Sequence, residues 1–266
     1  MFDYGDKVDK VTNKRREIVF IILAGFFLGT LAILNILGIS RQIDLSFTLF
    51  GKTIPFIVFV GVLPYPITFL CTDFISELYG KKRATSVVWV GLLLNIWVLF
   101  IMWLGGALPP HPELVDGGLP AIDDPNRTFF QIRQWTFGAT IASMIAYLTA
   151  QFIDVHIFHA IRKATHGKLL WLRNNGSTLT SQMVDSIAVI TITYIYAKSA
   201  IMIQPGETVA HGMIILILSN YVYKMVSALI DTIPFYIGTK HLSRYLKIDL
   251  SKEFVKEGKS DEKIKD

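Results

Sequence analysis

The sequence predicts an all-α integral membrane protein with six transmembrane helices and with both chain ends in the cytoplasm. Three observations predict this fold class. The 266 residues are 52% hydrophobic with a mean hydropathy of +0.46, the apolar residues come in six long runs, and the loops between the runs carry very unequal numbers of Lys and Arg. A bilayer core of about 30 Å takes roughly 20 apolar residues per helical crossing, and a soluble domain of this size does not need runs of that length.

The apolar runs set the expected spans. Bounded by charged or Pro/Gly-rich breaks, they lie near residues 18–38, 54–79, 84–108, 134–161, 178–203 and 211–239. The first run is too long for the apolar part of a signal peptide, and Gly38-Ile39-Ser40 is not a convincing cleavage site, so we expect a spanning helix there. Six crossings return the chain to its starting side, and three plus three helices would give two halves of inverted topology.

The distribution of basic residues predicts the side on which the chain ends lie. The N-terminal segment, the loop near residue 82, the loop near residue 168 and the C-terminal tail hold 20 of the 26 Lys and Arg residues, whereas the opposite loops hold five. Because short cytoplasmic loops carry the excess of Lys and Arg, both termini are expected in the cytoplasm. Residues 1–245 then form the transmembrane domain, and residues 246–266 form a charged cytoplasmic tail. Bases dispersed in this way do not indicate a nucleic-acid partner, despite the formal charge of +5.

The first external loop contains a segment of alternating character. Residues 43–49 alternate apolar and polar side chains, which is typical of a short extended stretch or hairpin. Two roles stay open for it on the sequence alone, a loop packed against the helices and a lid.

The second expected span contains a proline break followed by two carboxylates. Pro64-Tyr65-Pro66 interrupts the helix, and Asp73 and Glu77 follow it four residues apart on one face. Ionisable residues at membrane depth are costly and normally face a bundle interior or an aqueous path. Asp73 is expected roughly 10 Å inside the cytoplasmic boundary. Glu77 lies close to that boundary, where a simple pairing with Lys81 would explain it equally well.

The fifth expected span carries a polar stripe. It opens with the polar turn Asn174-Asn175-Gly176-Ser177, which supplies good N-cap residues. One helical face then carries four polar side chains, which are Thr178, Ser181, Gln182 and Asp185. At 1.5 Å per residue this stripe reaches about 12 to 15 Å into the membrane. Hydrogen bonds between helices would account for the Ser, Thr and Gln side chains, whereas Asp185 favours a functional site.

The sixth expected span has the most regular polar pattern. Asn220, Lys224, Ser227 and Asp231 recur at spacings of four, three and four, and Pro234 follows them. These residues form one polar face. An ion pair of Lys224 with either Asp231 or Asp185 would lower the cost of burying both charges. Such a pair could be structural, or its neutralisation and release could accompany the movement of a substrate or a proton.

The sequence lacks the patterns of metal sites and of common catalytic sites. His156 and His159 stand beside Asp154, but no HExxH motif or Cys partner accompanies them, and their basic neighbourhood favours interfacial histidines. No Walker glycine loop, nucleophile elbow or dinucleotide fingerprint occurs. We therefore expect no metal, no cofactor and no enzymatic activity. An intramembrane enzyme that uses Asp73, Glu77 and the histidines is the less favoured alternative.

Several separated segments together resemble one known family. In chain order they are Tyr65-Pro66 to Tyr79-Gly80, Gln151-Phe152-Ile153-Asp154, Trp171-Leu172-Arg173-Asn174-Asn175-Gly176-Ser177-Thr178 with Ser181-Gln182 and Asp185, and Lys224 with Asp231-Thr232-Ile233-Pro234. This combination resembles the queuosine precursor transporter family, also called the vitamin uptake transporter family. The match runs over most of the chain and is specific as a combination, whereas each piece alone would be weak. The chain departs from the expected pattern at His156, where we expect tyrosine.

The resemblance implies a multi-pass importer in the bacterial inner membrane. Its substrates would be 7-deazaguanine bases, namely the 7-cyano or 7-aminomethyl queuosine precursors or queuine, salvaged for tRNA modification. A homodimer is left open, and so is the related role of a vitamin-binding subunit of an energy-coupling-factor type importer. The candidate substrate-binding residues are Asp73, Glu77, Asn175, Gln182, Asp185, Asn220, Lys224 and Asp231. Their carboxylates suit the adjacent N–H donors of such a base, and Lys, Asn and Gln suit its carbonyl oxygen.

Overall fold

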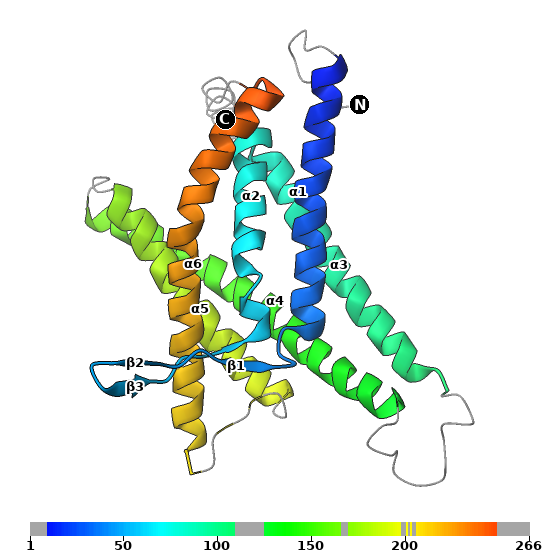
Figure 1. Ribbon diagram of the computed structural model, residues 1–266, viewed down its shortest axis with the longest axis vertical. Helices are drawn as coiled ribbons and strands as arrows, with labels where there is room; N and C mark the ends of the chain where they lie inside the picture. Colours follow the sequence, from blue (N-terminus) through cyan, green and yellow to red (C-terminus); the bar gives the residue numbers. More distant parts are fainter. Residues whose placement is uncertain are drawn as a thin grey trace. The chain divides into compact units, whose positions relative to one another are not determined.

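The computed structural model describes residues 10–109, 125–165, 170–197, 201, 203 and 206–248. Within them the chain is mostly helical (Figure 1). The helices are α1 (Lys10–Leu37), α2 (Tyr65–Tyr79), α3 (Lys81–Ala107), α4 (Pro125–Ala164), α5 (Leu170–Tyr196) and α6 (Val209–Leu246). Three of these described helices, α1, α3 and α6, are long and apolar enough to cross a membrane. The count of six crossings stays a prediction.

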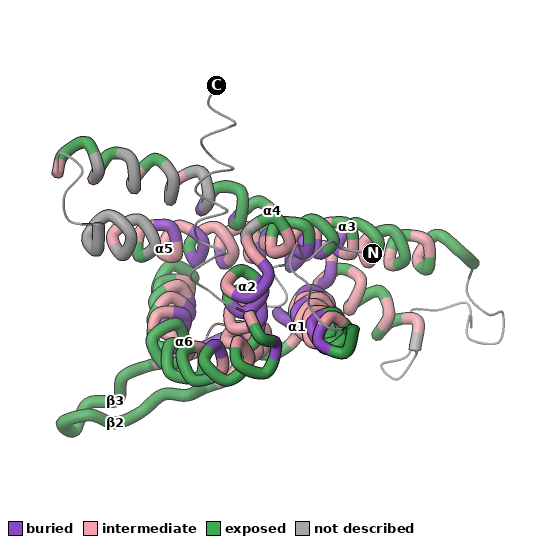
Figure 2. Tube along the Cα trace, turned by 90° about the horizontal axis from the view of Figure 1, so that it is seen from above, coloured by how far each residue is buried: buried purple, intermediate pink, exposed green. Residues whose placement is uncertain are grey.

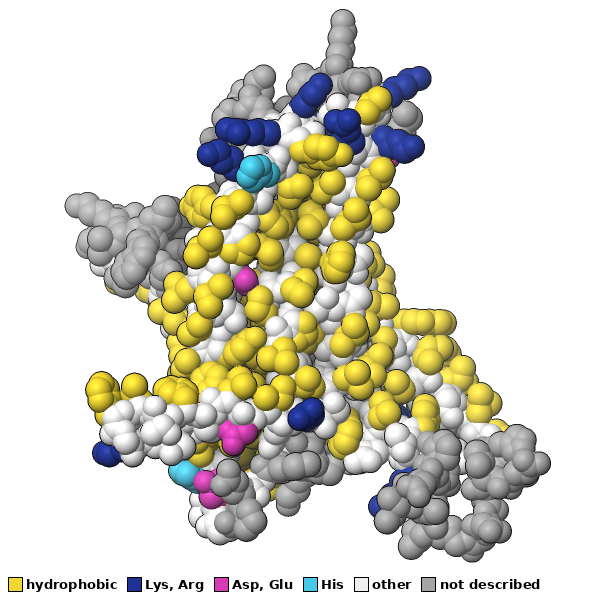
Figure 3. Space-filling view, in the orientation of Figure 1, with side chains coloured by type: hydrophobic (Ala, Val, Ile, Leu, Met, Phe, Trp, Pro, Cys, Tyr) yellow, Lys and Arg dark blue, Asp and Glu magenta, His cyan; other side chains and the backbone are white. Residues whose placement is uncertain are grey.

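The long helices expose large apolar side chains. Trp89 of α3 is 62% exposed and Leu229 of α6 is 71% exposed, and hydrophobic side chains cover much of the face seen in Figure 3. Extended apolar surfaces of this kind mark contact with a membrane or with another protein. Lipid tails offer no hydrogen-bond partners, and a helix satisfies its backbone N–H and C=O groups internally. Helices with apolar surfaces can therefore contact lipid tails.

The chain divides into two compact units. The first comprises Met1–Leu31, Pro64–Leu94 and Ser227–Asp266, and so contains parts of α1, α3 and α6 together with all of α2. Its apolar core has two clusters, one around Phe27 and Ile75 and one around Leu78 and Leu246. The second unit comprises Ala32–Leu63 and Asn95–Val226. The division therefore runs through three helices rather than between the third helix and the fourth.

One basic residue in the first unit has a structural role. Arg16 is buried, and its Nε and Nη2 donate to the backbone carbonyls of Leu246 at 2.9 Å and Lys247 at 2.7 Å. The Tyr79 hydroxyl donates to the carbonyl of Arg16 at 2.8 Å. The last carbonyls of a helix have no partner within it, and a cation suits that end of the helix dipole. Arg16 thus ties α1, α2 and α6 together.

The second unit is built on the pairing of α4 with α5, which lie side by side in Figures 1 and 2. Small side chains allow this close approach. Gly138 of α4 lies against Ala197, so that an added Cβ would come within 2.8 Å of the Ala197 Cβ. Along α4 the same kind of residue recurs in buried positions, which are Ala139, Ala142, Ala146 and Ala150.

The chain between α1 and α2 is not helical. Strand β1 (Gln42–Asp44) pairs antiparallel with β4 (Ile57–Phe59), and β2 (Phe47–Leu49) pairs antiparallel with β3 (Lys52–Ile54). A short 3-10 turn, Val60–Val62, leads to α2. The expected span from residue 54 is thus wrong over residues 54–64. The helix begins only at Tyr65, because Pro66 lacks an N–H and fits the first turn, where no donor is needed.

The non-helical backbone before α2 finds its partners inside the second unit. The Gly61 N–H donates to the Gly38 carbonyl at 2.9 Å, and the Ile57 N–H donates to Ser219 Oγ of α6 at 3.1 Å. An added Cβ on Gly61 would lie 2.7 Å from the Gly38 Cα, so this approach requires glycine. Irregular backbone at membrane depth is tolerated where protein surrounds it, and these contacts provide that protection.

Two further boundaries differ from expectation. Helix α5 begins at Leu170 and ends at Tyr196, so the expected polar turn at residues 174–177 is helical and the expected end at residue 203 is too late. Asn and Ser are good N-cap residues, but a local preference of this kind is overridden by tertiary context. In α6, Pro234 lies inside the helix, where it leaves the carbonyl of Ile230 without its usual donor.

Candidate functional site

The main polar feature of the second unit is a buried ion pair between α5 and α6. Lys224 Nζ donates to Asp185 Oδ2. Lys224 is only 6% exposed and Asp185 only 7%. Either charge alone would be costly at this depth, and the pair keeps both compensated. Of the two partners considered for Lys224, the structure brings it to Asp185.

Gln182 precedes Asp185 by one turn on the same face of α5. Its Oε1 is buried and has no hydrogen-bond partner among the described residues. A buried acceptor without a donor costs about 1–3 kcal/mol. Asp185 uses Oδ2 for Lys224. Gln182 and Asp185 are about 4.5 Å apart in rise along the helix axis, and their oxygen acceptors suit a ligand that brings its own N–H groups.

Other buried polar side chains continue this face. The members on the two helices are Ser181, Ser186, Thr193, Ser219 and Asn220. Asn220 Nδ2 donates to the Leu216 carbonyl at 2.7 Å, within its own helix. The polar stripe of α5 thus extends beyond the predicted residues to Thr193, whose Oγ1 is buried without a partner among the described residues.

The first unit holds the other predicted carboxylates. Helices α2 and α6 approach closely there, since an added Cβ on Gly238 would overlap the ring of Phe74. Asp73 of α2 and Asp231 of α6 lie close enough for their charges to interact. Oδ2 of Asp231 is buried and has no partner among the described residues, whereas Asp73 is exposed in this unit. Glu77 is half-buried.

A cluster of buried amides was missed by the sequence analysis. Asn35 Nδ2 of α1 donates to Asn95 Oδ1 of α3 at 2.7 Å, and Ser143 Oγ of α4 donates to Asn35 Oδ1 at 3.3 Å. Both asparagines are buried in the second unit. Hydrogen bonds between helices of this kind join apolar helices in membranes. In the sequence, the indication of this cluster was one asparagine within each of two apolar runs.

The structure does not assign some predicted residues to the Asp185–Lys224 pair or to the carboxylates Asp73 and Asp231. The side chain of Asn175 lies outside the described residues, and so does that of His159. His156 is exposed. Among the described residues, no three His, Cys, Asp or Glu side chains are placed to hold a metal ion.

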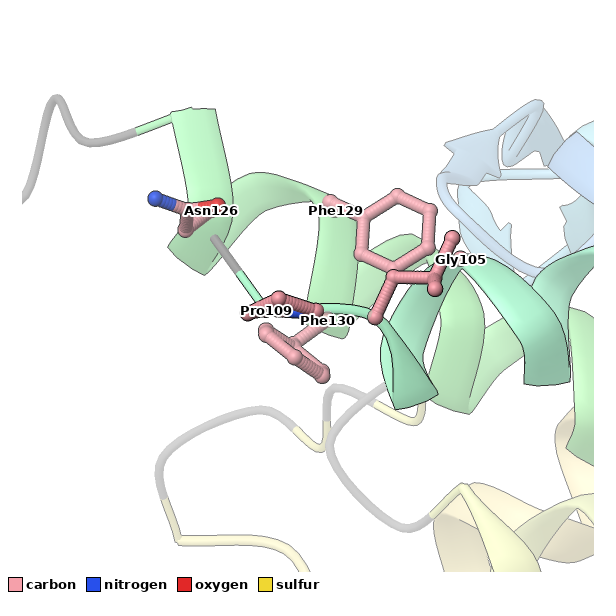
Figure 4. A pocket seen from close by; sticks show the side chains of 6 residues that line it. Gly105, Pro109, Asn126, Phe129 and Phe130 are labelled. Atoms are coloured by element: carbon pink, nitrogen blue, oxygen red, sulfur yellow. The ribbon is translucent and has the colours of Figure 1, made fainter. Parts of the chain in front are cut away.

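A surface cavity of about 210 Å³ lies at the end of α3 and the start of α4 (Figure 4). The residues that line it are Gly105, Leu108, Pro109, Asn126, Phe129 and Phe130. It offers aromatic faces and a single side-chain amide, and it contains none of the predicted site residues. We therefore do not assign the site to it.

Comparison with known proteins gives matches to one kind of protein. Residues 59–238 match the model of a family described as "Putative vitamin uptake transporter", and all the candidate residues lie within this range. The chain is 29% identical over 205 residues to the probable queuosine precursor transporter of Bacillus subtilis, covering 76% of this chain and 79% of that protein.

Two further relatives carry similar names. The probable queuosine precursor transporter of Haemophilus influenzae is 24% identical over 230 residues, which is 84% of this chain and 86% of that protein. The queuosine precursor transporter of Escherichia coli is 23% identical over 184 residues, which is 66% of this chain and 70% of that protein. No solved structure matches the chain.

Proposed function

Because this chain belongs to the vitamin uptake transporter family, we propose that it imports queuosine precursors across a bacterial inner membrane. The relatives are named as transporters, so the enzyme alternative loses its support. The substrates would be 7-cyano- or 7-aminomethyl-7-deazaguanine or queuine. In this proposal six helices cross the bilayer, and both chain ends lie in the cytoplasm.

The observation that carries the proposal is the buried Asp185–Lys224 pair beside the buried Oε1 of Gln182, to which no described residue donates. A deazaguanine presents adjacent N–H donors and a carbonyl oxygen on one edge. The carboxylate of Asp185 and the Gln182 Oε1 accept from the N–H groups, and Lys224 donates to the carbonyl. The base thus supplies a partner for each group.

This arrangement explains how a buried charge pair can open. When the base binds, the hydrogen bond between Lys224 and Asp185 is replaced by charge-assisted hydrogen bonds to the substrate, so that neither charge is left uncompensated. Without substrate the pair closes on itself. Asp73, Glu77, Asn175, Asn220 and Asp231 remain proposed substrate-binding residues.

The alternative within transport is a vitamin-binding subunit that needs a separate energising module. The family's description as vitamin uptake transporters favours it. Uptake of the base by liposomes that contain only the purified chain would contradict this alternative.

The test of the proposed function uses bacteria that cannot synthesise queuosine and lack their own importer. Expression of the chain should restore queuosine in tRNA from nanomolar amounts of one of the three bases, measured by the mobility of the tRNA in a boronate gel. Asp231→Asn should abolish restoration while the amount of membrane-inserted protein is unchanged, because it removes one of the proposed binding carboxylates. Asp185→Asn should also abolish restoration, but it leaves the buried Lys224 uncompensated and so lowers the amount of folded protein as well.

A matched control is Asp44→Asn. Asp44 lies at the end of β1, outside the expected spans, where Ser46 holds its carboxylate, the Ser46 N–H donating to Oδ1 at 2.9 Å. These hydrogen bonds to Ser46 lower the pKa of Asp44 below its ordinary value. The variant should restore queuosine as the unmodified chain does. Failure of the unmodified chain with all three bases would defeat the substrate assignment.

A further inference from the structure

The hairpin of β2 and β3 has one apolar face and one polar face. In its register Phe47 stands opposite Ile54, Thr48 opposite Thr53, and Leu49 opposite Lys52. Because side chains alternate between the faces of a strand, the pairs at the two ends share a face and the threonine pair occupies the other. The turn between the strands carries Phe50, which is 96% exposed.

The apolar face of the hairpin is not covered by the rest of the second unit. All residues of β2 and β3 are exposed, and Figure 2 colours both strands as exposed along their length. Phe47, Leu49 and Ile54 are among the exposed large hydrophobic side chains. Of the two roles left open by the sequence, a packed loop and a lid, neither explains why this face is exposed. Large apolar side chains that stay in water forgo the free energy that burial would supply. An exposed apolar face of this kind therefore marks contact with a membrane or with another protein.

The position of the hairpin indicates what that occupant is. The chain enters it directly after α1 ends at Leu37, and the backbone next to it is fixed to α6 through Ile57 and Ser219. It therefore begins where α1, a helix long and apolar enough to cross a membrane, ends. The end of a spanning helix lies near the lipid headgroups.

We propose that the β2–β3 hairpin is an interfacial anchor that lies in the headgroup layer of the outer leaflet. Phe47, Leu49, Phe50 and Ile54 contact the acyl boundary, and the two threonines face water. Lys52 lies on the apolar face itself. Its stem packs on lipid while its ammonium reaches the phosphates, whereas protein interfaces are depleted in Lys. Aromatic side chains favour this layer of the membrane. The inference does not depend on which substrate the protein carries.

The test measures the surroundings of single hairpin positions in the full chain. In a Cys71→Ser background, nitroxide labels are placed by Thr48→Cys, Leu49→Cys, Phe50→Cys, Thr53→Cys and Ile54→Cys, and each protein is reconstituted in vesicles of phosphatidylethanolamine and phosphatidylglycerol. Collision rates with oxygen and with a water-soluble nickel chelate are then compared. The ratio of oxygen to nickel collisions should be several-fold higher at positions 49, 50 and 54 than at positions 48 and 53.

Two results would overturn the proposal. Nickel access that is equally high at all five positions would mean that the hairpin lies in water, as a lid does when open. Low access to both reagents at the apolar positions, with broadening between labels that disappears when labelled protein is diluted with unlabelled protein, would mean that a second copy covers the face. Since the substituted side chains are exposed, a symmetric peak in size-exclusion chromatography suffices to show that each variant is folded.

Discussion

Gln182 and Asp185 share a face of α5, but their surroundings differ in a way that allows a test. Asp185 is compensated by Lys224, so its loss disturbs both folding and any ligand contact. Gln182 offers a buried acceptor to which no described residue donates. Replacing Gln182 therefore tests the contact with the ligand without the effect on folding that the loss of Asp185 would have.

Gln182→Leu should weaken substrate binding without lowering stability. The loss of one hydrogen bond of about 1–2 kcal/mol raises the substrate concentration for half-maximal uptake roughly 5- to 30-fold. The melting temperature in detergent should stay the same or rise, because a buried acceptor without a partner is removed. Uptake is measured over a series of substrate concentrations, and unfolding is followed by tryptophan fluorescence.

The matched control for this residue is Gln131→Leu, since Gln131 is exposed on α4. It should leave both the uptake curve and the melting temperature unchanged. If Gln182→Leu lowered stability and left uptake affinity intact, the glutamine would be a packing residue and not a ligand-binding one.

At the scale of the elements, the junction between β4 and α2 requires a close approach between the backbones of Gly38 and Gly61. Gly61→Ala should destabilise the protein, because its Cβ would meet backbone atoms of Gly38, which cannot rotate away as a side chain can. Overpacking of this kind costs about 1–3 kcal/mol. We expect a lower melting temperature and faster hydrogen exchange of the Gly61 amide, which bonds to the Gly38 carbonyl.

Gly25→Ala provides the comparison for that substitution. Gly25 lies within α1, and an added Cβ there would meet nothing within 4 Å. Alanine favours a helix over glycine by about 1 kcal/mol, so this variant should be neutral or slightly more stable. Equal melting temperatures for the two variants would show that the Gly38–Gly61 approach contributes little.

For the whole molecule, the prediction concerns its orientation in the membrane. In the Cys71→Ser background, a membrane-impermeant maleimide should label the Thr53→Cys variant in intact spheroplasts, and should label the Lys82→Cys variant only after lysis. The reason is the concentration of 20 of the 26 Lys and Arg residues in one set of loops. Labelling of Lys82→Cys in intact spheroplasts would reverse the assigned orientation.

Much of this architecture could be predicted because its signals are local. Long apolar runs predicted helices at the right places, and charged or amide residues within them pointed to the side chains that the structure buries, such as Asp185, Lys224 and Asn220. The matched family was recognised from the order of its motifs. Two failures were local as well. Residues 54–64 are as apolar as a helix but form strand ends and a 3-10 turn, and residues 174–177 are as polar as a turn but helical.

By itself, the sequence determined that the chain is an apolar, multi-helix transporter of a particular family, since length, hydropathy and motif order are properties of the chain alone. Only the tertiary structure decided that Lys224 pairs with Asp185, that Arg16 binds the end of α6, and that the Asn35 and Asn95 side chains meet. Each of these contacts joins residues far apart in the chain. Which faces of two helices meet depends on the packing of all the side chains between them, and the period of a single helix does not contain that information.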